Sequence, residues 1–520
     1  MSDIAVAESS TRLQNFLDRA GLRGFPWKTA TLLYLISNFW FFLILDSIWW
    51  DDNAMFSDMW NDVIRKAGFP PWTHLTKLLL VTFGPSVVRM LTFFIFFVLP
   101  CTVFMILSSF EKFEPKLEEK KFIVLIFSIV PIVTHKVPAV TFTYSFSLLL
   151  FFGAWLVSVR STKSWTNICS ALLFILSFQN AAMIPLFVLP LAHHLYMNEI
   201  FNQRKSIGRL IWSAASAFLT IPILYLGLRS LFWPNVVGTY QLKANKVDDA
   251  IFLILAAAIV IFAWINSSLL RMQLNLFWIS LGLFSCALGL TAFVATNQIG
   301  QKLWFKYPAM MFGRSGWFGR HLILQPLGIA LIIVGVVGLI FKFSAKIRRL
   351  VLGLIIAFCV LMNVGFGFEY VVDYQKQVEI VEEIRSSGPN ASDSWTFIDR
   401  ATLLNARGRE YAIHDWVGII SRAKPKLLNI KTTDFDVLSQ RGFIRNSCST
   451  SAQFSGVSAI VEIRGPETHW EALQNWVSDG DMGFKVTVDD TPGACKPEMV
   501  TNQRSSGAIP ILFYFTGAKG

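Results

Sequence analysis

Two adjacent carboxylates, Asp51 and Asp52, directly follow a pair of tryptophans in the segment 49–53, Trp-Trp-Asp-Asp-Asn. A long apolar run precedes this segment, so the pair is expected at the edge of a bilayer. A low-dielectric edge raises a carboxyl pKa towards the range of a working general base, and paired carboxylates also hold divalent cations. Asp51 and Asp52 are therefore predicted as catalytic residues or as ligands of a divalent cation. The alternative is that acidic residues simply populate the outer side of a membrane.

A second polar set forms a basic segment late in the apolar part of the chain. Its candidate phosphate-binding residues are Lys302, Lys306, Arg314, Arg320 and His321. Glycines at 313, 316 and 319 make the backbone adaptable there, so guanidinium groups could close onto a phosphate. A lipid-linked phosphate would suit this site. The alternative is that these cations reach towards lipid headgroups at a helix end.

Membrane helices must position both segments. The chain is 54% hydrophobic and only 15% charged, which leaves too little polar surface for a water-soluble protein of 520 residues. We predict an α-helical polytopic membrane protein with about eleven spans. The expected spans are 30–48, 86–109, 121–134, 139–159, 165–179, 182–197, 210–230, 250–268, 275–293, 322–341 and 350–368.

The distribution of charge predicts the orientation of these spans. The net charge of +12 is spread over short basic groups between alternate apolar runs, which indicates a cytoplasmic N-terminus and no nucleic-acid partner. The expected parts are a cytoplasmic segment 1–29, a transmembrane domain 30–368 and a soluble domain 369–520. The acidic loop 49–85 and the basic loop 294–321 would both face outward. An odd number of spans places the soluble domain outside, in the periplasm if the membrane is a bacterial inner membrane.

The region after residue 369 has the composition of a small α/β domain. Strands are expected at 396–398, 457–463, 484–488 and 509–515, with helices at 370–384 and 467–477. Cys448 and Cys495 are the only cysteines in this region, and an extracytoplasmic location predicts that they form a disulfide. The polar residues around Asp399 and Arg400 are expected on the surface of the domain or in contact with an acceptor. Lys136, in a short outward turn, is expected to face headgroups, and the alternative is that it lines a cavity.

The layout and the two polar loops together resemble the C-type integral-membrane glycosyltransferases (GT-C), which take a sugar from a polyprenyl-phosphate carrier. The resemblance implies that Asp51, or Asp52 in its place, is the catalytic base or a metal ligand. It implies that Arg314 and Arg320 bind the donor phosphate, with His321, Lys302 and Lys306 beside them. The implied partners are a polyprenyl-phosphate-linked sugar, membrane lipids and a glycan, lipid or protein acceptor. The motifs identify no subfamily, sugar or acceptor.

Two other functions fit the same layout, and a purely structural or assembly role is a further alternative. A transporter or flippase of lipid-linked sugars would also need outward cations and a cavity between helices, although paired interrupted half-repeats are not visible in the sequence. A membrane-bound acyltransferase would use His321 or His135 as its base. These functions differ in which substitution should abolish activity.

Overall fold

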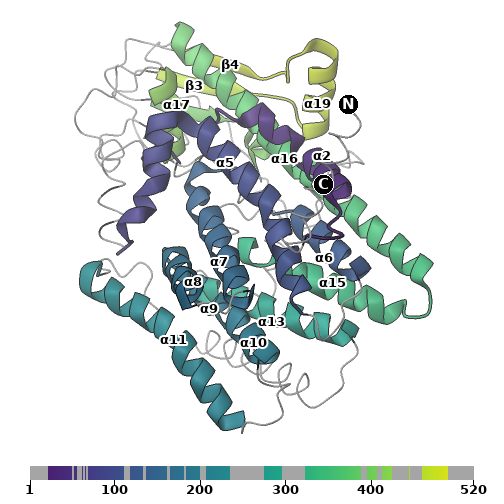
Figure 1. The fold of residues 1–520 in the computed structure, drawn as a ribbon. Coiled ribbons are helices and arrows are strands. Elements are labelled where there is room, and N and C mark those ends of the chain that lie inside the picture. Colours follow the sequence, from purple (N-terminus) through teal and green to yellow (C-terminus); the bar gives the residue numbers. More distant parts are fainter. Residues whose placement is uncertain are drawn as a thin grey trace, which may run out of the picture.

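The computed structural model shows a mostly helical protein with a small mixed sheet near the C-terminus (Figure 1). Because the apolar runs dominate the sequence up to residue 368, the regular structure of the described residues in that part is helical. The structure describes residues 22–49, 52–55, 61, 65, 68–110, 117–132, 136–160, 164–180, 183–198, 207–234, 274–295, 322–387, 395–406, 411, 413–423, 444–445 and 459–489.

Four helical segments in the described residues are long and apolar enough to cross a membrane, which indicates a multi-pass membrane protein. They are Trp27–Ile44, Pro71–Ser108, Ala139–Arg160 and Ala345–Ser386. Shorter apolar helices are Trp165–Ser177, Met183–His193, Thr220–Phe232, Leu274–Gly289 and Pro326–Ile340. The expected span 250–268 lies outside the described residues, so the number of eleven stays a prediction.

The helical elements of this region follow one another with short connections where the chain is described. They are α2 (Trp27–Asn38), η1 (Phe39–Ile44), α3 (Asp52–Met55), η2 (Pro71–His74), α5 (Leu75–Ser108), α6 (Leu117–Ile129), η5 (Ala139–Thr141), α7 (Phe142–Arg160), α8 (Ser164–Ser177), α9 (Met183–Leu186), α10 (Val188–Asn198), α11 (Ile207–Phe232), α13 (Leu274–Ala295), α15 (Pro326–Ile340) and α16 (Ala345–Ser387).

Helix α5 consists of two straight parts that meet at Gly84. Gly84 has φ +80° and ψ 173°, a conformation that side chains disfavour, and Pro85 follows without an N–H to donate. The second part, from Pro85 to Ser108, is long enough to cross the hydrocarbon core by itself. The kink at Gly84 therefore separates the part from Pro85 to Ser108 from the first part of α5, which follows the acidic loop.

Glycines allow α13 and α15 to pack closely. A Cβ on Gly282 would lie 2.7 Å from the carbonyl oxygen of Gly328, and a Cβ on Gly335 would lie 2.7 Å from that of Asn275. The earlier contact residue on α13, Asn275, meets the later one on α15, Gly335, and Gly282 meets Gly328. The two helices are therefore antiparallel. Close backbone approach of this kind is the usual way to gain dispersion energy between helices in lipid.

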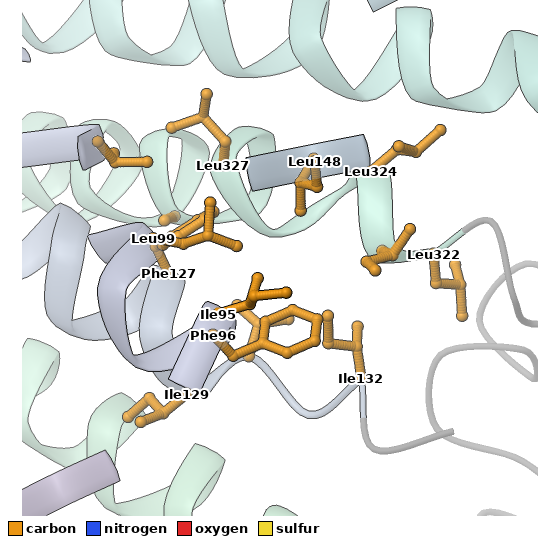
Figure 2. Close-up of a cluster of buried hydrophobic side chains, with 14 of the residues drawn as sticks. Ile95, Phe96, Leu99, Phe127, Ile129, Ile132, Leu148, Leu322, Leu324 and Leu327 are labelled. Carbon is orange, nitrogen blue, oxygen red and sulfur yellow. The ribbon is translucent and has the colours of Figure 1, made fainter. Parts of the chain in front are cut away.

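A large apolar cluster fills much of the core of the bundle. Figure 2 shows side chains of α5, α6 and α7 packed against the residues that lead into α15. These side chains include Ile95, Phe96, Leu99, Phe127, Ile129, Ile132, Leu148, Leu322, Leu324 and Leu327. The chain therefore enters α15 beside the end of α6.

Polar contacts gather at the two ends of the bundle. At one end, Arg348 lies 3.8 Å from Glu118, and the indole of Trp278 donates to Glu119 at 3.1 Å. These residues belong to the beginnings of α16, α6 and α13, which the charge pattern assigns to the cytoplasm. The loop after η1, the beginning of α7 and the later part of α16 meet at the other end. This grouping agrees with the predicted alternation of loops, while the identity of the cytoplasmic end stays a prediction.

Helix α16 joins the bundle to the C-terminal domain. It has 43 residues, or about 64 Å at 1.5 Å per residue, whereas a bilayer core is about 30 Å thick. Its later part must therefore extend beyond the apolar layer. On the way, Gly367 lets the ring of Trp40 lie against the helix backbone, and Tyr370 stacks on the same indole with centroids 6.4 Å apart.

The C-terminal domain folds against this extension of α16 (Figure 1). Its sheet has the order β2-β1-β3-β4, in which β1 pairs in parallel with β2 and β3, and β3 pairs antiparallel with β4. The strands are β1 (Trp395–Asp399), β2 (Ile444–Arg445), β3 (Ala459–Arg464) and β4 (Lys485–Asp489). The remaining elements are η7 (Thr402–Leu404), α17 (Ile413–Ala423) and α19 (His469–Asp479).

The predicted strands and the helix 467–477 of this domain are confirmed where the chain is described. Strands 396–398, 457–463 and 484–488 correspond to β1, β3 and β4, and the expected helix 467–477 corresponds to α19. The hydroxyl of Thr468 accepts the amide of Glu471 at 3.1 Å and Gly480 ends the helix with φ +76°, which explains its bounds. The expected strand 509–515 lies outside the described residues.

Candidate functional site

Among the described residues, most of the buried charged side chains lie at the end of the bundle nearest the C-terminal domain. We call this region the outer junction: it consists of residues 45–55, residues 85–89 of α5, residues 136–141, residues 369–387 of α16, and α17. Helix α3 contacts α17 there, so the acidic loop touches the C-terminal domain directly. The outer junction contains Asp52, the one predicted catalytic residue that lies in the described part of the chain.

Asp52 is completely buried and its carboxylate is occupied by backbone amides. One oxygen accepts the amide of Val140 at 2.7 Å, and the other accepts those of Ala139 at 2.9 Å and Trp49 at 3.2 Å. The first amides of a helix have no partner within that helix, and Asp52 supplies one for the start of η5 and α7. The carboxylate thus fastens the acidic loop to the beginning of a membrane helix.

Arg89 is the counter-charge of Asp52. It is also fully buried, and its Nη2 lies 3.6 Å from the Asp52 carboxylate. The same guanidinium donates from Nε to the carbonyl of Val137 at 2.8 Å and from Nη1 to that of Leu45 at 2.6 Å. Arg89 of α5 therefore connects the segment around Leu45 to the segment around Val137. It can do so because its planar guanidinium carries several N–H donors in a fixed arrangement.

The environment of Asp52 raises its pKa from an ordinary value of 3.8 to about 6. Burial is the largest cause, because it disfavours the charged carboxylate, while Arg89 and the three amide donors act in the opposite direction. A pKa of about 6 is suited to proton transfer. The geometry of Asp52 is not suited to proton transfer, because both carboxylate oxygens are buried and already accept backbone amides.

We predict that this pKa makes stability depend on pH. The folded pKa lies above the unfolded one, so the contribution of Asp52 is complete below about pH 4 and is lost as the pH rises through about 6. The loss should amount to about 2–3 kcal/mol of unfolding free energy. The unfolding midpoints of the protein and of Asp52→Asn are measured from pH 4 to pH 7. The difference between the two midpoints should change over this range, because only the unsubstituted protein loses the contribution of Asp52. Parallel pH profiles for the two proteins would contradict the raised pKa.

Asp46 is the accessible carboxylate of the same loop. Its side chain is exposed, and it accepts a hydrogen bond from the hydroxyl of Ser86 just after the α5 kink. Among the described residues near the end of the first helical segment, Asp46 is exposed and Asp52, six residues later, is buried. Sequence alone could not separate the two, because both follow the same apolar run.

Lys136 lies inside the bundle, contrary to the expectation that it faces headgroups. It is 3% exposed, and its ammonium donates to the side-chain oxygen of Asn38 at 3.0 Å. The rings of Tyr34 and Phe96 flank the ammonium at 5.7 and 5.2 Å from their centroids. Burial lowers the pKa of Lys136 to about 7. The two rings come from α2 and α5, so only the tertiary packing forms this pocket.

A second buried network connects α16 to the C-terminal domain. Lys376 is fully buried and donates to both carboxylate oxygens of Asp399 at 2.7 Å, to Asn405 at 2.6 Å and to the carbonyl of Ala401 at 3.1 Å. The expectation that Asp399 lies on the surface or contacts an acceptor is therefore wrong: it is the partner of a buried lysine. The apolar spacing that predicted β1 contained no information about its charged neighbour.

Asp373 binds the same domain one turn earlier in α16. It accepts the hydroxyl of Tyr411, the amide of Ala406 at 2.7 Å and the side-chain amide of Gln377 at 3.3 Å. Arg422 of α17 donates in turn to the carbonyl oxygen of the Gln377 side chain at 2.8 Å. The domain is thus attached to the membrane helix by charged and polar groups as well as by apolar packing.

The remaining predicted site residues lie outside the described residues. They are Asp51, Lys302, Lys306, Arg314, Arg320 and His321, together with the predicted disulfide pair Cys448 and Cys495. The four cysteines that the structure describes are free thiols. Leu322, the residue directly after His321 in the sequence, lies near Ile132 in the apolar cluster (Figure 2). Ile132 comes shortly before residues 136–141 of the outer junction.

The donor groups of the described residues do not form a metal site. No group of three or more His, Cys, Asp or Glu residues comes together in the described ranges. Both oxygens of Asp52 already accept backbone amides, so this carboxylate does not fit the role of a cation ligand.

The fold and its buried charges define a multi-pass membrane protein with a docked C-terminal domain. Neither a scan against models of known protein families nor a search of characterised proteins found a match to this chain. The functional argument therefore depends on the outer junction and on the sequence of its loops.

Proposed function

We propose that this protein is a membrane glycosyltransferase that moves a sugar from a polyprenyl-phosphate-linked donor to a glycan, lipid or protein acceptor on the extracytoplasmic face. The observation that carries the proposal is the anchoring of Asp52 by Arg89 and three backbone amides. Asp51, the proposed catalytic residue, directly precedes this anchored residue in the sequence. The position of Leu322 near Ile132 adds support, because Leu322 directly follows the predicted phosphate-binding residues in the sequence.

The geometry favours different roles for the two neighbouring aspartates. Asp52 has no free oxygen for a substrate, so it is a positioning residue that holds the loop. Asp51 is the proposed catalytic base. It would take the proton of the acceptor hydroxyl while the acceptor oxygen bonds to the anomeric carbon of the sugar. The bond from that carbon to the lipid phosphate breaks, and the phosphate leaves with the electron pair, its charge met by Arg314 and Arg320.

Substitution of Asp51 tests this function. We expect Asp51→Asn to abolish one glycan modification in the host, with accumulation of its polyprenyl-phosphate donor and a normal amount of protein in the membrane. Loss of a catalytic base should lower turnover by about two to four orders of magnitude. The measurement is mass spectrometry of glycans and lipid-linked sugars, together with immunoblotting of membranes.

Asp58→Asn is the matched control, since Asp58 belongs to the same acidic loop. If acidic residues merely populate the outer side, both variants should behave alike, and unchanged glycans in Asp51→Asn would overturn the proposal. An acyltransferase would instead lose activity with His321→Ala. A flippase would show the donor trapped on the cytoplasmic face, detected by its protection from externally added enzymes.

A further inference from the structure

Helix α19 of the C-terminal domain leaves an apolar face exposed. Trp470 is 52% exposed, Trp476 38% and Val477 76%. Trp470 and Val477 are seven residues apart, so they lie on the same side of the helix, and Trp476 lies at the border of this side. Ala472 is fully buried, so the helix packs against the protein on its other side. Large aromatic side chains exposed together on a folded domain indicate an interaction surface.

The membrane part of helix α16 shows which side of the protein faces lipid below this domain. Its exposed apolar side chains recur every three or four residues, which places them in one stripe along the helix. They are Leu350, Leu354, Phe358 and Leu361. The bundle packs against a different side of α16, where the side-chain amide of Asn363 donates to the carbonyl of Ile129 of α6. The exposed stripe of α16 therefore contacts lipid tails.

The C-terminal domain covers the same stripe where α16 leaves the bundle. Val372 continues the stripe by helical spacing and is fully buried. Helix α19 and strand β4 both contact α16, and Met482, between them, belongs to the same apolar cluster as Val372. Figure 1 shows α19 on the side of α16 away from α5 and α7. Helix α19 therefore lies above the lipid that the stripe contacts and not above the bundle.

We infer that α19 docks the C-terminal domain onto the lipid surface, with Trp470, Trp476 and Val477 in the headgroup region of the nearer leaflet. Tryptophan favours this region, because its ring is apolar while its N–H can still donate to water or headgroups. An amphipathic helix with an exposed apolar face lies in the plane of such an interface. The contact adds a second attachment of the domain to the buried network of Lys376, and it fixes the height of the domain above the bilayer.

The charge of α19 indicates which lipid its surface fits. The helix carries Glu471 and Asp479, and residues 469–479 contain neither Lys nor Arg. Anionic headgroups attract clusters of Lys and Arg, so a helix with only carboxylates gains nothing from them. The surface of α19 therefore fits zwitterionic phospholipid. The inference depends on the described residues and on the membrane location, and it does not require the proposed function.

Photo-cross-linking of the full-length protein in phosphatidylcholine nanodiscs tests the inference. Val477→p-benzoylphenylalanine places a short-range photoreactive group on the apolar face of α19. Ser478→p-benzoylphenylalanine is the matched control, since Ser478 is exposed on the polar side of the same helix. We expect about fivefold or more phosphatidylcholine adduct at 477 than at 478, because consecutive side chains point about 100° apart on a helix. Mass spectrometry of the purified protein measures the adducts.

Substitutions of Trp470 make the result specific to the aromatic face. Trp470→Ser should lower the adduct at 477 by about threefold or more, while Trp470→Tyr keeps an interfacial ring and should retain the adduct. Adding phosphatidylglycerol to the nanodiscs should not raise the yield. Equal adducts at 477 and 478, or no lipid adduct at either position, would overturn the inference. A covalent dimer formed from 477 would also overturn it and would assign the face to a second copy of the chain. Because the readout is a lipid adduct, it is independent of whether Asp51→Asn affects glycans.

Discussion

Asp52→Ala should lower the free energy of unfolding at pH 7 by about 3–5 kcal/mol, the usual range for removing one partner of a buried ion pair. The substitution leaves the Arg89 guanidinium buried without its counter-charge. It also removes the acceptor of three amides, two of which begin η5 and α7. Thermal or denaturant unfolding of the purified protein in detergent measures this loss.

Asp46→Ala is the control for the loss of an acidic side chain from the same loop. Asp46 is exposed, so its removal should change stability by less than about 1 kcal/mol. A double-mutant cycle of Asp52→Ala with Arg89→Gln should show positive coupling, with the pair less destabilised than the sum of the single changes. Equal effects of Asp46→Ala and Asp52→Ala would mean that the buried pair does not hold the loop.

The second large effect is expected at the attachment of the C-terminal domain. Lys376→Met keeps the volume of the buried stem but leaves Asp399 without its cation, so the domain should be destabilised by about 3–5 kcal/mol. Hydrogen exchange followed by mass spectrometry should show faster exchange in β1 and η7. The α13 and α15 helices should stay protected, because their packing does not involve Lys376.

Two further variants make this result specific. Lys485→Met alters an exposed lysine on β4 and should leave exchange unchanged. The double variant Lys376→Met with Asp399→Leu replaces the ion pair by apolar groups and should recover part of the stability, as buried pairs often do. If the double variant is no more stable than Lys376→Met alone, hydrogen bonds to Asn405 and Ala401 carry the attachment instead of the ion pair.

The anchoring role of Asp52 affects how a loss of activity in this loop must be interpreted. Asp51 and Asp52 are neighbours in sequence, yet loss of activity would have different causes at the two positions. A loss in Asp52→Ala should accompany a loss of stability, whereas the proposed base Asp51 should affect turnover alone. Activity must therefore be compared with protein stability before either residue is assigned a catalytic role.

Part of this structure could be predicted from local sequence. Apolar runs of sufficient length predicted the helices that the structure shows at Trp27–Ile44, Ala139–Arg160 and Ala345–Ser386. Alternating apolar residues predicted β1, β3 and β4, and a Thr-x-x-Glu pattern marks the start of α19. Such features depend on residues that are close in the chain, so the sequence itself contains the necessary information.

The candidate site depended on contacts that the sequence does not encode locally. The types of residue and their order made Asp52 a candidate, but its burial against Arg89 joins positions 37 residues apart. Lys136 was expected at headgroups and is buried between α2 and α5, while Asp399 was expected on the surface and pairs with Lys376. The physical reason is that a buried charge is stable only with its partner, and packing of distant helices decides which partner it meets.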